Sequence, residues 1–274
     1  MNEHSGRTID DFRVMKLTEK TIAFPTTKLL PGAKATEAGA DELVVSVHSW
    51  LIESKGKKII VDTGIGNHKQ RAQAVFNDQN SDFLERLESA GFGRNQVTHV
   101  LLTHLHGDHV GWNTLLERGR WVPTFPKATY VMPRASIDHL RGNSDDPLMP
   151  LYLDSIEPVI SSGQAVLIQP GEEPLEGFQY VSTPGHSRDH CSIILRTPDR
   201  TCLFAGDIMH HPVQVQHPEL NSVFCASPEM AQLSRHKMLA FAADTRSLYF
   251  SSHFAETSVG EVTRSNENFR WTFV

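Results

Sequence analysis

Short apolar, β-branched runs alternate with polar and glycine-rich segments along most of the chain. Runs of this kind, four to eight residues long and bounded by turn residues, are typical of buried strands. They predict strands over residues 43–54, 57–64, 97–104, 128–133, 164–169, 178–185, 191–197, 200–207 and 247–253. The chain has no repeat and no low-complexity linker, so strands with interspersed helices predict one layered α/β domain.

Helical periodicity is less frequent than strand patterning. Residues 81–91 carry apolar positions on one side, with Ser81 as the expected N-cap. Residues 227–244 open with Ser227 and Pro228, and proline suits the first helical position. Two further helices are expected over residues 110–118 and 133–141. Loops that shape a pocket are expected at residues 67–79, 142–158 and 212–226.

Composition narrows the function classes. The chain has 274 residues and a formal net charge of −6, without clusters of lysine and arginine, which disfavours nucleic acid and anionic membranes as partners. No apolar run reaches transmembrane length, and the first residues do not resemble a signal peptide. The cysteines Cys191, Cys202 and Cys225 form no CxxC pattern, so we expect core residues in a reducing cytoplasm.

The stretch "THLHGDHVGW" concentrates ligand-type side chains directly after an apolar run. His104 and His106 alternate and can therefore point the same way, after which we expect Gly107 to turn the chain and bring Asp108 and His109 round. Imidazole and carboxylate groups suit zinc and similar divalent metals. A polar loop would explain one histidine better than a metal site does, but it does not explain four ligand-type residues in six positions.

Three later strand ends carry further ligand-type residues, at a place where α/β folds put their sites. His186 lies in "VSTPGHS", Asp207 in "LFAGD" and His253 in "LYFSSHF". Together with the first cluster, these positions predict a metal centre.

The pattern H-x-H-x-D-H, followed by a distant His, Asp and His, resembles the metallo-β-lactamase superfamily over about residues 44–254. The resemblance implies a four-layer αββα sandwich, with residues 1–274 forming a single hydrolase domain. Residues 1–12 are expected to form a disordered N-terminal arm, because chain ends are often poorly ordered. The resemblance also implies two divalent metal ions, with zinc favoured although manganese, iron and cobalt fit the same donors. The implied ligands are His104, His106 and His186 for one ion, Asp108, His109 and His253 for the other, and Asp207 as the bridge.

Other residues around these motifs have less certain roles. In "VDTG", Asp62 matches a carboxylate that orients metal ligands, but a simple turn residue fits the sequence equally well. In the quorum-quenching lactonases a tyrosine usually stands three residues after the bridging aspartate, where this chain has His210. The "GDIMHHPVQ" setting is similar to the methyl parathion hydrolase group and its lactonase and arylesterase relatives, so we expect His210 to line the pocket. The role of His211 stays open.

The remaining histidines are assigned to the surface or to packing. His190 is predicted to be exposed rather than placed behind a ligand. Surface positions are expected for His4, His68, His139 and His236, and packing positions for His48 and His99.

The departures from the superfamily pattern favour one branch. An aspartate rather than a cysteine at "AGD" disfavours β-lactam hydrolysis, and the lack of basic segments disfavours nucleases. We therefore expect an enzyme, a metal-dependent hydrolase in which a metal-bridging hydroxide cleaves a lactone or aryl ester, with side activity on phosphotriesters. Asp108, Asp207 and His210 are the expected catalytic residues, and the partner is a small ester or lactone, with a homodimer implied by the resemblance alone.

Two alternatives stay open. A thioester hydrolase similar to glyoxalase II would use the same metal core, but the C-terminal stretch has Arg264 and Arg270 without a basic cluster. A non-catalytic protein that binds a metal or senses a ligand on the same scaffold is the other alternative, and a complete ligand set disfavours it.

Overall fold

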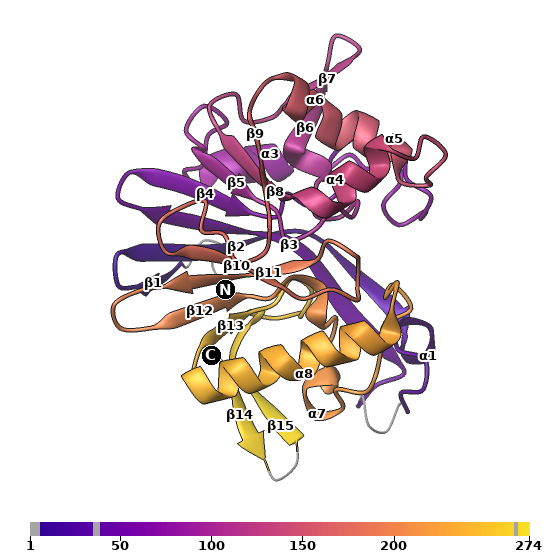
Figure 1. Cartoon of the computed structure of the whole chain (residues 1–274), viewed down its shortest axis with the longest axis vertical. Helices are drawn as coiled ribbons and strands as arrows, with labels where there is room; N and C mark the ends of the chain where they lie inside the picture. Colours follow the sequence, from indigo (N-terminus) through magenta and orange to yellow (C-terminus); the bar gives the residue numbers. More distant parts are fainter. Residues whose placement is uncertain (1–5, 35–38, 266–267) are drawn as a thin grey trace. The chain divides into compact units, whose positions relative to one another are not determined.

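The computed structural model describes residues 6–34, 39–265 and 268–274 (Figure 1). The chain divides into two compact units. Unit 1 comprises residues 1–19 and 47–169, and unit 2 comprises residues 20–46 and 170–274. The long strands β2 (Phe12–Pro25) and β3 (Glu42–Ser54) contribute residues to both units.

Unit 1 is built on a seven-stranded sheet with the order β1-β2-β3-β4-β5-β8-β9. Its other strands are β1 (Arg7–Ile9), β4 (Lys57–Val61), β5 (His99–Leu101), β8 (Thr129–Pro133) and β9 (Ala165–Ile168). The pairs β4–β5, β5–β8 and β8–β9 are parallel, so each needs a crossover connection. Helices supply two of these crossovers: α3 (Phe83–Ser89), α4 (Arg134–Arg141), α5 (Met149–Leu151) and α6 (Glu157–Ser161), with a π-helical turn at Tyr152–Ile156.

One face of this sheet holds the core of unit 1. Leu51, Ile60, Val100 and Tyr130 are register partners on neighbouring strands, so their side chains share a face. The apolar side chains of α3, α4 and α6 join them in one buried cluster. Between β5 and β8, a short 3₁₀ turn (Gly111–Asn113) leads into the hairpin of β6 (Thr114–Glu117) and β7 (Arg120–Pro123). The packed helices therefore fix the carboxyl ends of the parallel strands.

Unit 2 is built on a six-stranded sheet with the order β10-β11-β12-β13-β14-β15. The strands are β10 (Phe178–Ser182), β11 (Cys191–Arg196), β12 (Thr201–Phe204), β13 (Leu248–Phe250), β14 (Val259–Ser265) and β15 (Asn268–Phe273). Its helices are α1 (Thr26–Leu29), a 3₁₀ turn (Gly206–Ile208), α7 (Val213–Gln216) and α8 (Pro228–Thr245). Only β12–β13 is parallel among the pairs of this sheet, and α8 lies in its crossover (Figure 1).

Helix α8 closes the core of unit 2. Its residues Met238 and Leu239 are buried in one cluster with Leu203 of β12 and Val262 of β14. The helix ends at Arg246, whose backbone is left-handed with φ of 52° and whose N–H caps the last turn. This packing holds β12 and β13 side by side, which matters because both strands end at ligand-type residues.

Most predicted elements are confirmed. Each of the nine predicted strands is present, as are the helices expected over residues 81–91, 133–141 and 227–244. The expected helix over residues 110–118 is wrong, because this segment pairs as the β6–β7 hairpin around left-handed Arg118 and Gly119. The segment 142–158 is likewise more regular than the expected loop. The strands β2, β14 and β15 were not predicted.

The N-terminal arm also differs from the expectation of disorder over residues 1–12. Residues 7–9 form β1, which pairs with β2 through Arg7 opposite Val14 and Ile9 opposite Phe12. Asp10 adopts a left-handed backbone with φ of 48°, which permits the tight turn between the strands, and Ile9 is buried. Residues 1–5, and with them His4, lie outside the described residues. The single-domain boundary over residues 1–274 stays a prediction.

Candidate metal centre

The first ligand group in unit 1 is the ligand turn, residues 103–109, which follows the carboxyl end of β5. Strands β4 and β5 are parallel with Val61 opposite Leu101, so Asp62 lies beside the start of the turn. The Asp62 N–H donates to the Leu101 carbonyl at 3.0 Å. The pairing of two parallel strands therefore places a carboxylate directly next to the histidines.

Asp62 holds both ends of the ligand turn. Its Oδ1 accepts the backbone N–H of Thr103 at 2.8 Å, and its Oδ2 accepts the Thr103 hydroxyl at 2.8 Å. Oδ2 also lies 2.9 Å from Nδ1 of His109. Because an ionised carboxylate only accepts, Nδ1 carries the proton and Nε2 keeps the lone pair that a metal needs. Of the two interpretations left open by the sequence, the structure supports the orienting carboxylate.

The imidazole rings of the ligand turn crowd together. The ring centroids of His104 and His106 are 4.6 Å apart, and those of His104 and His109 are 4.1 Å apart. The Asp108 Oδ2 lies 3.7 Å from Nε2 of His109. Since His104 and His109 are buried, three charged imidazolium rings at these separations would repel one another strongly. Neutral imidazoles with the Asp108 carboxylate beside them suit a divalent cation.

The chain turns at Gly107 as expected, but by a different backbone geometry from the usual one for glycine. Its backbone does not adopt a left-handed conformation, so the chain does not use glycine here for its conformational freedom. The turn is closed by an ordinary hydrogen bond from the His109 N–H to the His106 carbonyl at 3.0 Å. The presence of glycine at position 107 therefore has a cause other than backbone conformation.

The second ligand group lies in unit 2 and collects residues from three strand ends. His186 follows β10, Asp207 follows β12 in the 3₁₀ turn, and His253 follows β13. Strands β12 and β13 are parallel, and β10 runs in the same direction because β11 is antiparallel to both of its neighbours. The three carboxyl ends therefore meet at one edge of the sheet. We call His186, Asp207, His210 and His253 the Asp207 cluster.

One carboxylate oxygen is the centre of this cluster. Oδ2 of Asp207 lies 2.9 Å from Nε2 of His253, 3.2 Å from Nε2 of His186 and 3.4 Å from Nε2 of His210. Nδ1 of His253 lies 3.0 Å from the Ser46 carbonyl, which can only accept, so neutral His253 keeps its lone pair on Nε2. A lone pair facing a carboxylate at 2.9 Å is repulsive unless a cation or proton sits between them. The donor set thus fits a metal ion.

His210 is buried within the Asp207 cluster, and its place in the lining of a pocket stays a prediction. Its ring stacks on His253 at 5.2 Å with an interplanar angle of 10°, and it lies 6.0 Å from the ring of Phe224. Burial lowers the pKa of His210, although the hydrogen bond and the charge of Asp207 act in the opposite direction. Burial also lowers the pKa of His211 to about 4, and the Val213 N–H donates to its Nδ1 within the same loop.

Most of the sequence matches a known family. A model of the metallo-beta-lactamase superfamily matches residues 43–253, which is more than half of the chain. The chain belongs to the metallo-β-lactamase superfamily. This confirms the expected fold class and places the chain among metal-dependent hydrolases, with both groups of candidate ligands inside or at the end of the matched range.

Lactonases are among the relatives of this superfamily member. An N-acyl homoserine lactonase from Bacillus sp. is 23% identical over 167 residues, covering 57% of this chain and 60% of the relative. The chain thus spans about three fifths of the length of the curated relatives it matches. AidC, a dizinc quorum-quenching lactonase solved with a product, has a TM-score of 0.83 at 20% identity, covering 98% of this chain and 97% of AidC. The hydrolase AbOPH has a TM-score of 0.81 at 22% identity, covering 98% and 96%.

Two positioning groups of this superfamily member were missed by the sequence prediction. His190 was expected to be exposed, but it is buried, with Nδ1 2.8 Å from the Thr183 hydroxyl. Its Nε2 accepts the backbone N–H of Asp207 at 2.8 Å. The prediction was wrong because the start of β11 returns next to the end of β10 and carries His190 behind the ligands. The spacing of four residues from His186 was the available signal.

Glu19 is the second missed group, because β2 itself was not predicted. Its buried carboxylate accepts the N–H groups of Ile65 at 2.6 Å and Trp112 Nε1 at 2.8 Å, which lie on either side of the ligand turn in sequence. Burial raises the pKa of Glu19, and these hydrogen bonds act against that rise. Gly64 has a φ of 63°, and a Cβ there would collide with Oε2 of Glu19, so this position requires glycine.

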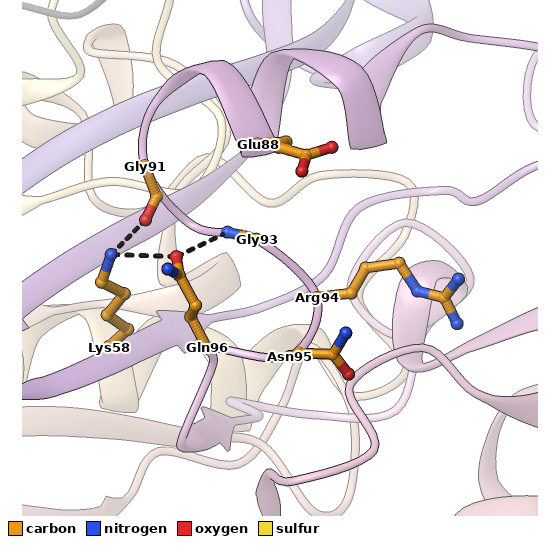
Figure 2. A pocket seen from close by; sticks show the side chains of 7 residues that line it. All are labelled: Lys58, Glu88, Gly91, Gly93, Arg94, Asn95 and Gln96. Carbon is orange, nitrogen blue, oxygen red and sulfur yellow. Dashed lines mark hydrogen bonds between the residues drawn. The ribbon is translucent and has the colours of Figure 1, made fainter.

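An open pocket of unit 1 lies at the opposite ends of β4 and β5 (Figure 2). Lys58 donates there to the Gly91 carbonyl and to Oε1 of Gln96, and Gly93 and Arg94 also line it. None of the predicted site residues lines this pocket. In the ranges that the structure describes, no helix has the length and apolar character needed to cross a membrane.

Proposed function

We propose that this chain is a dinuclear metal-dependent hydrolase that opens lactones or cleaves aryl esters, with side activity on phosphotriesters. In this proposal the ligand turn and the Asp207 cluster supply one centre, with zinc as the favoured metal. The assigned ligands are His104, His106 and His186 for one ion, Asp108, His109 and His253 for the other, and Asp207 as the bridge.

The observation that carries the proposal is the arrangement around Asp207. Three imidazole nitrogens lie within 3.4 Å of one buried carboxylate oxygen, at distances of 2.9, 3.2 and 3.4 Å. A buried carboxylate surrounded by neutral imidazoles is a poor arrangement without a cation and a good one with it. The similarity to lactonases supports the choice of substrate class.

Bound divalent ions would supply the nucleophile at neutral pH, since metal binding lowers the pKa of water from 15.7 to about 7. The residues of the chain would provide the rest. Asp62 orients the His109 ring, and His190 fixes the backbone of Asp207. Burial lowers the pKa of His210, so its neutral ring would hydrogen-bond the substrate oxygen through Nε2–H, and only after gaining a second proton would it pass one to the leaving group. Apolar substrate groups would lie against Phe224, which neighbours the His210 ring.

The test combines metal analysis with a panel of substrates. Purified protein is expected to hold two zinc ions per chain and to turn over an acyl-homoserine lactone, dihydrocoumarin or p-nitrophenyl acetate, with slower turnover of methyl parathion. The variant His109→Ala should lose metal and activity, whereas His236→Ala, which alters an exposed histidine of α8, should lose neither.

The same panel separates the alternatives. Turnover of S-lactoylglutathione without turnover of any lactone or ester would favour the thioester hydrolase. Full metal loading without turnover of any compound would favour a non-catalytic protein. A metal content of zero in protein purified with added zinc would contradict all three.

A further inference from the structure

Arg71 is a buried arginine held in one orientation within unit 1. Its side chain is 5% exposed, with Nη1 2.7 Å from Oδ2 of Asp154 and Nη2 2.9 Å from Oδ1. Nη2 also donates to the Ser155 hydroxyl at 3.1 Å. A two-pronged arginine–carboxylate pair fixes direction as well as distance. The guanidinium therefore cannot swing aside as a solvent-exposed arginine can.

Asp154 owes its direction to an irregular helix. It lies in the π-helical turn Tyr152–Ile156, between α5 and α6. A π turn inserts a residue into the helical repeat and changes which side chains face inward, and such turns are frequent at functional sites. Here the turn directs the Asp154 carboxylate at Arg71. The backbone carbonyl of Asp154 accepts a hydrogen bond from Nζ of the buried Lys69 at 3.0 Å.

Arg71 packs against Gly107, the glycine between the candidate ligands His106 and Asp108. A Cβ at position 107 would lie 3.1 Å from both Cδ and Nε of Arg71 and 3.7 Å from Cδ1 of Leu151. Contacts of 3.1 Å are too short for carbon unless a neighbour moves. Because the backbone of Gly107 is not left-handed, its glycine is required by the position of Arg71 rather than by the conformation of the turn.

The Nε of Arg71 gives an independent sign that the residue is placed for the turn. This atom is buried and has no hydrogen-bond partner among the described residues, while both terminal nitrogens of the guanidinium are bonded. It is also one of the two atoms nearest to the missing Cβ of Gly107. A buried donor without a partner is unfavourable, so its retention beside the ligand turn calls for a reason in the site.

We propose that Arg71 is a positioning residue of the metal centre. Held by Asp154, it forms the wall on which Gly107 rests, and it thereby fixes the directions of His106 and Asp108. This inference rests on the proposed function only in taking these two residues as metal ligands.

The test is a double-mutant cycle read by zinc affinity, measured by competition with a chromophoric chelator. Gly107→Ala should weaken zinc binding about 10-fold, because its methyl group meets a guanidinium that cannot yield. Arg71→Ala should weaken it by a similar factor, because the turn loses its wall. The double variant should bind zinc no worse than Arg71→Ala alone. The matched control is Gly93→Ala, whose Cβ would make an ordinary contact of 3.4 Å with Gln96 (Figure 2).

Two further readouts separate positioning from a structural role. Arg71→Lys keeps the positive charge but cannot make the paired hydrogen bonds of a guanidinium to Asp154. We expect this variant to melt near the wild-type temperature, whereas the absorption spectrum of its Co²⁺-loaded form should differ from that of the wild type. If Arg71→Ala does not fold, Asp154→Asn, which releases the guanidinium, takes its place in the cycle: it should weaken zinc binding as predicted for Arg71→Ala, and adding Gly107→Ala to it should cause no further loss.

The proposal is overturned if the effects of Gly107→Ala and Arg71→Ala add independently, or if both variants bind zinc like the wild type. The outcome is distinguishable from a failure of the proposed function. If the wild-type protein binds zinc but hydrolyses no substrate, the proposed function is contradicted, and the zinc affinities of the variants can still be compared. If the wild-type protein is active but the effects of the two substitutions on zinc affinity simply add, only the role of Arg71 is contradicted.

Discussion

The two groups of candidate ligands are assembled from very different stretches of chain. In unit 1, four of them come from one six-residue stretch after a single strand, and Asp62 on the neighbouring strand braces both ends of it. In unit 2, the members come from separate strand ends, with His253 and Asp207 46 residues apart in sequence. The ligand turn therefore depends on local hydrogen bonds, and the Asp207 cluster depends on the register of a whole sheet.

This difference extends to the chemistry that holds each group. The ligand turn is oriented from outside by a charged group, the carboxylate of Asp62. The Asp207 cluster carries its charge at the centre and is oriented from outside by neutral groups, the Ser46 carbonyl and the His190 ring. Hydrogen bonds to charged groups contribute about 1.5–3 kcal/mol and neutral ones about 0.5–1.5 kcal/mol. The two groups should therefore respond unequally to matched substitutions.

The largest effect is expected from removing the central charge. Asp207→Ala removes the carboxylate that lies at the centre of three imidazoles, so we expect kcat/KM to fall about 10³-fold or more, equivalent to about 4 kcal/mol, together with loss of bound metal. Kinetics on the best substrate and elemental analysis check this outcome. Asp199→Ala, on an exposed turn of the same unit, is the control. Full zinc content in Asp207→Ala would show that the carboxylate of Asp207 is not required for metal binding.

A second contrast concerns the buried cations. Burial lowers the pKa of Lys69 in unit 1 to about 7, whereas unit 2 buries Arg235, which stays protonated and whose Nε donates to the Ile208 carbonyl at 3.0 Å. Below about pH 7 Lys69 is protonated in both the folded and the unfolded chain, so the free energy of unfolding is lowered by the full cost of burying its charge. Between there and its ordinary pKa of 10.5, the unfolded chain binds more protons, so stability rises with pH.

Lys69→Met should remove this dependence. The free energy of unfolding of the wild type, relative to this variant, should rise by up to about 1.4 kcal/mol per pH unit from about pH 7 to pH 10, a few kcal/mol in all. Urea denaturation across that range measures it. Lys55→Met, at a position 65% exposed, should show no such slope. A difference between wild type and Lys69→Met that stays constant with pH would mean that Lys69 keeps its proton in the folded chain.

The charged brace of the ligand turn is tested by Asp62→Asn. This variant keeps the shape of the side chain but loses its charge, and we expect metal affinity or kcat/KM to fall about 10- to 100-fold, the usual range for groups that orient metal ligands. Asp82→Asn is the control, because the exposed Asp82 lies 2.7 Å from the half-buried Arg86 and forms its ion pair with that residue rather than with a histidine. Unchanged zinc affinity in Asp62→Asn would reduce Asp62 to a turn residue.

The same contrast explains how far the sequence could predict the molecule. The ligand turn is visible in the sequence because its residues are contiguous and follow an apolar run. The strand ends at His186, Asp207 and His253 are visible as positions, but their meeting depends on the parallel pairing of β12 with β13, which no local spacing encodes. The prediction that these three residues belong to one site came from the family pattern and not from hydrophobic periodicity.

The failures of prediction share a physical cause. His190 and Glu19 are polar residues made useful by burial against another element, so their surroundings come from pairing across the sheet rather than from their own neighbours in sequence. The π-helical turn at Tyr152–Ile156 was expected to be part of a loop, because the prolines on either side of it, Pro150 and Pro158, and its own polar residues weaken the helical pattern that packing restores. Gly107 is a different case: the chain turns there as expected, but without a left-handed backbone, and a Cβ at this position would crowd Arg71.

The smallest effect is expected from the neutral brace of the Asp207 cluster. His190→Ala removes an acceptor for the Asp207 N–H, and we expect kcat/KM to fall by about 5-fold, or about 1 kcal/mol, with zinc content unchanged. His190→Gln, whose side-chain carbonyl can accept the same N–H, should recover part of the loss. The fall in kcat/KM caused by His190→Ala, divided by the fall caused by Asp62→Asn, decides the comparison between the neutral brace and the charged one. If His190→Ala costs as much as Asp62→Asn, then placement by the sheet, rather than the charge of the brace, controls both ligand groups.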